Sequence, residues 1–215
     1  AHRMRHLAYP DGFYVGGQVP HSVGHTGAWS EQLERGTWQA RYDSMVTAAN
    51  GHNWADGMVD AWCLSGDAGV MHSALLYGEH VAWAMSPTFT ALGTHERSAG
   101  WSLKAIMALY NQTYDPEYLA AAKRIAGVAL KEQDLAGCGA WPHVLPLDHA
   151  NGRANVVGNN LFLIGVLLGG LQAYAEVVQD PAVDQALIAG VRWVAKSWDE
   201  SAGGWPYSAT PEGMP

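Results

Sequence analysis

The sequence predicts an all-α protein built from repeated helical hairpins, and three observations point to this class. Apolar residues recur at helical spacing in several long stretches. Each stretch breaks at a short corner, and a second helical stretch follows at once. Runs with the alternating pattern of a strand are almost absent. We therefore expect αα-hairpins over about 54–86, 100–133 and 161–199, with a further helix within 28–49.

A shared corner marks the second helix of each predicted hairpin. An aromatic residue lies near the end of each first helix, and an Asp follows it within one or two turns. These residues are Asp67, Asp115 and Asp180, and Pro comes directly after the last two. Asp accepts hydrogen bonds from the free amides of a helix start, and Pro is tolerated in the first helical turn. Each Asp is thus predicted to be the N-cap of a second helix.

Repeated hairpins separated by long loops favour an α-solenoid or an α/α toroid, in which first helices form an inner ring. Small residues suit a crowded inner ring, and Gly165, Gly169 and Gly170 fall within one first helix. A ring of six hairpins needs about twelve helices, whereas the chain supplies about seven. We expect a loop-rich segment over 1–26 and a toroid domain over 27–215. The ring is expected to be partial, or the chain to be a piece of a longer polypeptide.

Composition excludes several classes of function. The formal net charge of −8 argues against a general nucleic-acid binder and against binding to an anionic membrane. The longest apolar stretch, 161–171, is too short to span a bilayer. The chain has two cysteines, Cys63 and Cys138, which are too few for a disulfide framework. A single disulfide between them is compatible with the sequence. Ten Trp and ten His make a composition that is common in proteins that handle sugars.

Residues with useful chemistry collect where the predicted first helices begin. If these helices run parallel, their starts meet on one rim, where free N–H groups favour anions. The rim would carry imidazoles, carboxylates, a guanidinium, amides and Trp rings. Its candidate catalytic residues are His25, His52, Asp56, Asp60, Glu96, Arg97 and Tyr207. Its candidate substrate-binding residues are His21, Trp54, Trp101, Trp141, His143, Asn159, Asn160 and Trp205.

Each of these residues also has a structural interpretation. Trp54 and Trp101 suit core positions equally well, and adjacent Glu96 and Arg97 suit a surface ion pair. Asp60 lies a turn deeper than Asp56 on one helical face, so it is expected to need a partner. The His21 and His25 pair has a metal-ligand spacing, but Gly24 between them argues against the helix that this spacing needs. We therefore expect no metal and no cofactor.

Three stretches carry a family resemblance: GHNWADGMVDAWCLSGD, THERSAGWSLKAIMALYNQTYDPEYLAAAKRIA and GGWPY. They resemble the repeats of α/α-toroid carbohydrate-active enzymes, most closely the helical catalytic domain of exo-rhamnogalacturonan lyase-like polysaccharide lyases. The resemblance covers about 21–207 and departs from the family's T-G-D corner at Ser65-Gly66-Asp67 and Thr113-Tyr114-Asp115. It implies an oligo- or polysaccharide substrate and further domains of a longer parent chain. A secreted or periplasmic location fits such a substrate.

Two mechanisms fit this rim. A β-eliminating lyase must neutralise the carboxylate of a uronic acid, supply a base and protonate the leaving oxygen. Candidates for the first task are Arg97, Asn159 and Asn160, and candidates for the base are His25, His52 and Tyr207. A glycosidase needs two carboxylates, for which Asp56 or Asp60 would pair with Glu96. In both mechanisms Trp54, Trp101, Trp141 or Trp205 would stack on sugar rings.

Plentiful His, one well-placed Arg and few acids favour the lyase over the hydrolase. A third hypothesis belongs to another class: a non-catalytic helical-repeat module that binds carbohydrate or protein. The sequence predicts neither the glycan nor exo or endo action.

Overall fold

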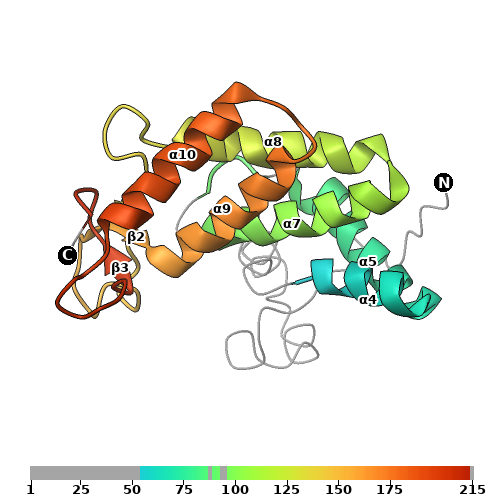
Figure 1. Ribbon diagram of the computed structural model, residues 1–215, viewed down its shortest axis with the longest axis horizontal. Coiled ribbons are helices and arrows are strands. Elements are labelled where there is room, and N and C mark those ends of the chain that lie inside the picture. The colour runs from blue at the N-terminus through green and yellow to red at the C-terminus, as the bar shows by residue number, and fades with distance from the viewer. Residues whose placement is uncertain (1–53, 87–88, 93–95, 214–215) are drawn as a thin grey trace, which may run out of the picture.

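The computed structural model describes residues 54–86, 89–92 and 96–213, and this part of the chain is mostly helical (Figure 1). The helices are α4 (Asp56–Ser65), α5 (Ala68–Glu79), the π-helical η2 (His80–Met85), α7 (Glu96–Thr113), α8 (Pro116–Glu132), α9 (Leu161–Ala175) and α10 (Pro181–Lys196). The strands are β1 (His143–Val144), β2 (Val157–Asn160) and β3 (Ser208–Ala209). The all-α prediction is confirmed at the coarse level of a mostly helical chain. The predicted helix within 28–49 and the predicted loop-rich segment 1–26 lie outside the described residues.

The predicted Asp caps are present at all three corners. The carboxylate of Asp67 accepts a hydrogen bond from the Gly69 amide at 2.8 Å, and those of Asp115 and Asp180 each accept one from the residue two positions on at 2.9 Å. Pro116 and Pro181 open α8 and α10, where a missing N–H leaves no hydrogen bond unmade. These local signals set where each second helix begins, so this prediction is confirmed.

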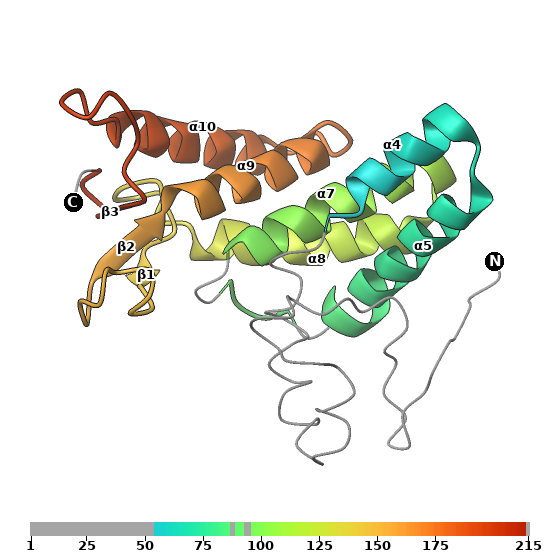
Figure 2. The same cartoon turned by 90° about the horizontal axis from the view of Figure 1, so that it is seen from below.

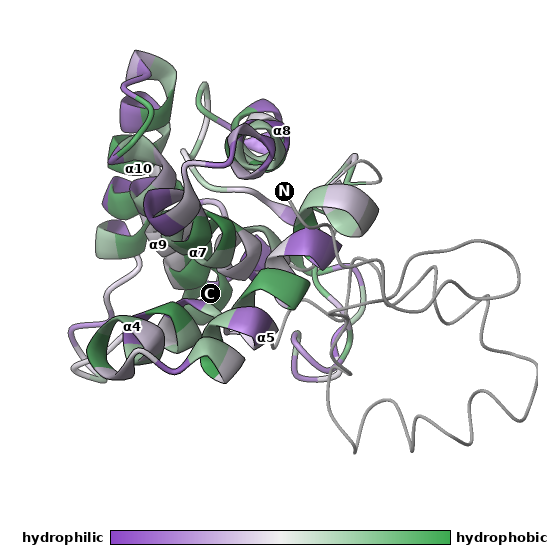
Figure 3. Ribbon diagram, turned by 90° about the vertical axis from the view of Figure 1, so that its right-hand side faces the viewer, coloured by the Kyte–Doolittle hydropathy of each residue, from purple (hydrophilic) through white to green (hydrophobic). Residues whose placement is uncertain are grey.

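Helix α7 lies among α4, α5, α8 and α9, which surround it when the molecule is viewed from one end (Figure 3). Its apolar side chains, including Leu103, Ile106 and Leu109, are fully buried. Burial of a side chain of this size stabilises the fold by about 1.5–3 kcal/mol. α7 is therefore the core helix of the described part.

Helices α7 and α9 run parallel and lie very close together. Arg97 near the start of α7 approaches Phe162 near the start of α9, and further along Lys104 lies beside Gly169. A Cβ atom on Gly170 would come within 2.5 Å of the Gly100 carbonyl oxygen, so the two backbones meet at this crossing. Of the three glycines expected to relieve crowding, only Gly170 lies at the crossing, and Gly165 faces open space.

Helix α4 is displaced along α7. The rings of Trp54 and Trp101 meet edge to face with their centroids 5.6 Å apart, and Asp56 Oδ2 lies 3.3 Å from Lys104 Nζ. α4 thus begins opposite residues 101–104, whereas α9 begins opposite Glu96 and Arg97. At 1.5 Å per residue this offset is about 10 Å. The starts of α7 and α9 share one level, and the predicted common rim does not include the start of α4.

A small antiparallel sheet, in the order β1-β2-β3, lies beyond the start of α9 and away from α4 and α5 (Figure 2). His143 pairs with Gly158, and Asn159 and Asn160 pair with Ala209 and Ser208. The sequence analysis missed this sheet because strands of two to four residues are too short for an alternating pattern to show. The sheet joins the 143–160 loop region to the segment after α10. In the described part of the chain, no helix is long and apolar enough to cross a membrane.

Candidate functional site

A buried polar cluster, made of Glu96, His143 and Asn159, connects the start of α7 to the sheet. Glu96 is the first residue of α7 and is fully buried. Its Oε1 accepts a hydrogen bond from Asn159 Nδ2 at 2.5 Å and lies 3.2 Å from His143 Nδ1. Asn159 also donates to the Trp141 carbonyl oxygen at 2.6 Å and accepts from the Trp141 amide at 3.2 Å. The cluster therefore fixes β1 and β2 against the first residue of α7.

The charge of Glu96 acts directly on His143. Burial alone would lower the pKa of His143, because it penalises the charged imidazolium. The hydrogen bond from His143 to Glu96 and the negative charge of Glu96 outweigh burial, so the pKa of His143 lies above its ordinary value of 6.5. The contact with Glu96 therefore favours the protonated form of His143.

A second group, which we call the surface site, lies at the same end of α7 and α9 and consists of Arg97, His149, Phe162 and Tyr207. The guanidinium carbon of Arg97 lies 5.9 Å from the centre of the Phe162 ring. The Phe162 and Tyr207 rings lie with their centroids 5.4 Å apart. The Tyr207 hydroxyl is 3.2 Å from His149 Nδ1, which is also 3.0 Å from the Asn160 side-chain oxygen. A cation, a phenol and an imidazole thus share one accessible area.

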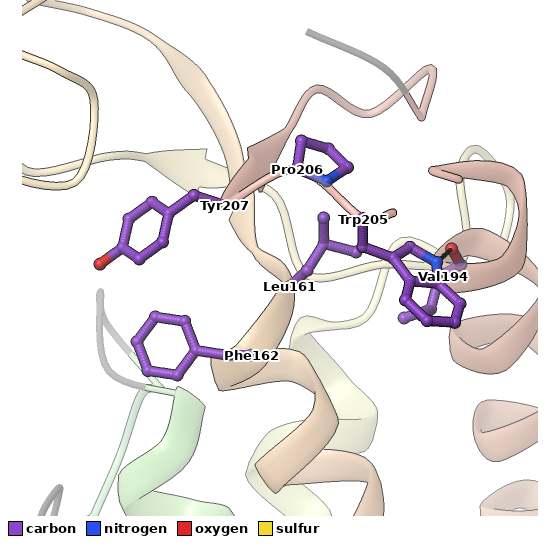
Figure 4. Close-up of a pocket in the computed structure, with 6 residues that line it drawn as sticks. All are labelled: Leu161, Phe162, Val194, Trp205, Pro206 and Tyr207. Carbon is purple, nitrogen blue, oxygen red and sulfur yellow. Dashed lines mark hydrogen bonds between the residues drawn. The ribbon is translucent and has the colours of Figure 1, made fainter. Parts of the chain in front are cut away.

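The surface site adjoins an aromatic pocket with a volume of about 390 Å³ (Figure 4). Figure 4 shows the rings of Phe162 and Tyr207 on one side of Leu161 and Pro206, with Trp205 on the other side beside Val194. The three aromatic side chains are 44–56% exposed. The indole N–H of Trp205 donates to the Val194 carbonyl oxygen at 2.9 Å, which holds this ring in place. Exposed aromatic faces with fixed orientation are suited to stacking against the apolar faces of sugar rings.

Four buried polar atoms around the two groups have no hydrogen-bond partner among the described residues. They are Glu96 Oε2, Arg97 Nε, His143 Nε2 and Asn160 Nδ2. Buried polar atoms in folded proteins are nearly always paired, with protein or with ordered water. Their concentration at one end of α7 and α9 indicates a place where water or the polar groups of a ligand complete the hydrogen bonding.

The structure brings seven of the predicted site residues to this end of the fold and leaves others apart from it. Residues in or beside the buried polar cluster and the surface site are Glu96, Arg97, Trp141, His143, Asn159, Asn160 and Tyr207. Trp205 lies in the aromatic pocket. Trp54 contacts Trp101 about one turn further along α7, and Asp56 contacts Lys104 about two turns further along. His21, His25 and His52 lie outside the described residues.

Three predicted roles are wrong. Trp141 cannot stack on a sugar, because it is buried and its indole N–H donates to the Ala129 carbonyl oxygen at 2.7 Å. Asp60 was expected to lie deep and need a partner, but it is exposed on α4, where water solvates it. Glu96 does not form a surface ion pair with Arg97, because Glu96 points into the buried polar cluster. Asn159 is likewise fully buried, and its side-chain amide donates to Glu96 and to the Trp141 carbonyl oxygen.

Sequence reasoning missed two members of the surface site. Phe162 comes two residues after Asn160, so a longer window at this helix start would have included it. His149 lies in the loop between β1 and β2, and its residue type was the only local signal. Its position depends on contacts with Asn160 and Tyr207, which are distant in sequence.

Among the described residues, no group of three His, Cys, Asp or Glu side chains lies close enough together to hold a metal ion. Cys63 and Cys138 are both free thiols, so the disulfide that the sequence left open is not formed. The chain has no significant match to a family model, to a curated protein or to a solved structure. The chemistry of the surface site itself must therefore support any statement of function.

Proposed function

We propose that this chain is a carbohydrate-active domain that cleaves uronic-acid-containing glycans by β-elimination at the surface site. One observation carries the proposal. Arg97 lies beside the exposed phenol of Tyr207, which is within hydrogen-bond distance of the His149 imidazole, and aromatic faces flank all three. A cation for a carboxylate, a proton-transfer group and stacking surfaces are the parts that this reaction needs.

In this reaction the base removes the proton at C5, next to the carboxylate of the uronic acid. The electron pair of the C5–H bond forms the C4–C5 double bond, and the bond from C4 to the glycosidic oxygen breaks. Arg97 would neutralise the carboxylate and stabilise the charge that builds up on it. The Tyr207 oxygen, ionised at the start, would take the C5 proton and would then give it to the leaving glycosidic oxygen, so that the proton count balances.

His149 would act on Tyr207. With the proton on Nδ1, His149 donates both to the Asn160 side-chain oxygen and to the Tyr207 oxygen, at 3.0 and 3.2 Å. A donor in this position would stabilise the negative charge that the Tyr207 oxygen carries when it acts as the base. The nearby positive charge of Arg97 acts in the same direction.

The hydrolase alternative has less support. Hydrolysis requires two carboxyl groups on opposite sides of the scissile bond. Glu96 is buried against His143, Asp56 is paired with Lys104, and Asp60 is on α4. Asp148 is an exposed acid whose Oδ2 lies 3.8 Å from His149 Nε2.

The arrangement of helices supports a partial α/α toroid as the finer description of the fold. α4, α7 and α9 run in the same direction, and each is followed by a returning helix, α5, α8 or α10. Successive parallel first helices, each with a returning partner, are the repeat of such a ring. A secreted or periplasmic parent with further domains remains part of this proposal.

The test is an ultraviolet absorbance assay for the C4–C5 double bond, run on a panel of uronate-containing polysaccharides. We expect wild-type protein to produce the signal, and Tyr207→Phe to lower the rate at least about 100-fold. Arg97→Gln should lower it as well. Tyr114→Phe is the matched control, because Tyr114 is an exposed tyrosine at the corner between α7 and α8.

Other outcomes would contradict the proposal in distinct ways. Full activity in Tyr207→Phe would remove Tyr207 as the base. New reducing ends without a double bond would indicate hydrolysis instead. Binding without any turnover by folded protein would indicate a non-catalytic module.

A further inference from the structure

The accessible part of α7 forms a narrow stripe. Between Glu96 and Leu109, every residue is buried except Arg97, Trp101, Lys104 and Ala108. These four recur at intervals of three or four residues, so they lie on one face of the helix. The surface site at Arg97 is therefore continuous along α7 with Trp101 and Lys104. We call Arg97, Trp101 and Lys104 the cationic stripe.

Helices α9 and α4 leave the stripe accessible from both sides. On α9, Gly165 faces open space between Phe162, which lies under Arg97, and Gly169, which lies beside Lys104. A side chain at Gly165 would project into this space. On the α4 side, Trp54 is 58% exposed and meets Trp101 edge to face. The stripe thus has glycines on one flank and an exposed indole on the other.

The two cations of the stripe are too far apart to bind one carboxylate. Arg97 and Lys104 are seven residues apart, which places their Cα atoms about 10 Å apart along the helix axis. Lys104 Nζ lies 4.9 Å from the centre of the Trp101 ring and 3.3 Å from Asp56 Oδ2. Lys104 therefore presents a cation above an aromatic ring, with one carboxylate, that of Asp56, already beside it.

We propose that Lys104 and Trp101 form a second anion-binding subsite, so that the cationic stripe binds a glycan that carries carboxylates on at least two of its sugars. This inference rests on the proposed function, because it takes the surface site as the place of cleavage. The carboxylate of a second sugar replaces Asp56 at Lys104, beside the Trp101 and Trp54 rings. Asp56 is thus an internal competitor for this subsite, and the chain's net charge of −8 makes a two-cation stripe a selective place for a polyanion.

The test is calorimetric titration of the full chain with oligouronates of increasing length, beginning with the monosaccharide. Lys104→Gln is expected to weaken binding of the longer oligomers about tenfold and to leave binding of the monosaccharide unchanged. Asp56→Asn is expected to tighten binding of the longer oligomers, because Lys104 loses its competitor.

Asp60→Asn provides the control for Asp56→Asn. It removes the same charge from the same helix at an exposed position one turn further on. We expect it to change binding little, since the effect of Asp56 comes from its contact with Lys104. Lys104→Arg, which keeps the charge, should retain most of the affinity and shows that the loss in Lys104→Gln is not a folding defect.

Three results would overturn the inference. The first is that Lys104→Gln weakens the binding of short and long oligouronates equally. The second is that Asp56→Asn and Asp60→Asn change the affinity for long oligomers by the same amount. The third is that folded wild-type protein binds no oligouronate. The absorbance assay separates this inference from the proposed function. If binding depends on ligand length and on Lys104 but no product forms, the subsite stands and the lyase proposal fails. If product forms and neither binding nor turnover depends on Lys104, the lyase proposal stands and the subsite fails.

Discussion

Glu96 and Arg97 are neighbours at the start of α7, yet their surroundings are opposite. Glu96 is fully buried and holds Asn159 and His143, which in turn hold the small sheet. Arg97 lies on the accessible stripe, beside Phe162 and near Tyr207. Successive residues on a helix point about 100° apart, so one helix start can serve the scaffold on one side and the ligand on the other. The buried polar cluster thus sets the position of the surface site without taking part in its chemistry.

The largest expected effect is a difference in the stability lost when Glu96 or Arg97 is replaced by Ala. Glu96→Ala leaves His143 and Asn159 buried without their partner, and we expect it to lower the free energy of unfolding by about 3–5 kcal/mol. Arg97→Ala should lower it by less than about 1 kcal/mol, because the Arg97 side chain is partly exposed and its Nε has no hydrogen-bond partner among the described residues. Chemical denaturation measures both. Equal losses in the two variants would contradict the division into scaffold and surface.

The crossing of α7 and α9 is expected to matter next, because it holds both groups at one level. In Gly170→Ala the new Cβ would lie 2.5 Å from the Gly100 carbonyl oxygen, so the helices must move apart, at a cost of about 1–3 kcal/mol. Gly165→Ala is the matched control on the same helix. Its Cβ would meet nothing within 4 Å, and the better helix propensity of Ala should stabilise the protein by up to about 1 kcal/mol. Thermal or denaturant unfolding would measure both variants. A change in stability of the same sign in Gly170→Ala and Gly165→Ala would contradict the close crossing.

Two tryptophans sharpen the comparison further. Trp141→Phe removes the buried hydrogen bond to Ala129, and we expect it to lower the free energy of unfolding by about 1 kcal/mol. Because Trp141 is buried and does not stack on a ligand, the affinity for ligand should not change. Trp205→Phe should change stability by about 0.5 kcal/mol or less, because the ring is exposed. Unfolding and ligand titration on both variants would test this. A larger loss of stability in Trp205→Phe than in Trp141→Phe would reverse the assignment.

The smallest expected effect is a pH dependence that belongs to the buried polar cluster. The pKa of His143 is raised in the folded protein, so the folded state binds this proton more tightly than the unfolded state does. The resulting stabilisation is fully present below the ordinary pKa of about 6.5 and is lost as the pH rises through the raised value. Glu96→Gln should remove most of this dependence, because it removes the charge that raises the pKa. Denaturation curves from pH 5 to 9 would show it, and an unchanged slope in Glu96→Gln would contradict the cause.

Local features of the fold were predictable from the sequence, and features that depend on distant contacts were not. Asp67, Asp115 and Asp180 cap helices through hydrogen bonds to residues two positions away, so the signal and the structure lie in the same short segment. The strand pairing of Asn159 with Ala209 joins residues fifty positions apart. Neither strand is long enough to show an alternating pattern in the sequence.

The candidate site shows the same limit. The sequence grouped Glu96, Arg97, Asn160 and Tyr207 because each was expected at the start of a first helix, and the structure brings them to one end although Tyr207 precedes β3 instead. It could not assign exposure, which depends on the crossing at Gly100 and Gly170. For this reason Trp141 was expected to reach a ligand and Glu96 was expected either to act as a catalytic acid or to pair with Arg97 at the surface, although Trp141 and Glu96 are both buried.

The most direct test of the central claim, that the surface site recognises a carboxylate through Arg97, compares one polyuronate with its carboxyl-reduced form. The two polymers share their linkages and differ in the charged group, so the difference in affinity isolates that group. We predict that wild-type protein binds the polyuronate at least about tenfold more tightly, which is about 1.4 kcal/mol, and that Arg97→Gln loses most of this preference. Equal binding of both polymers by the wild type, or an undiminished preference in Arg97→Gln, would contradict the account.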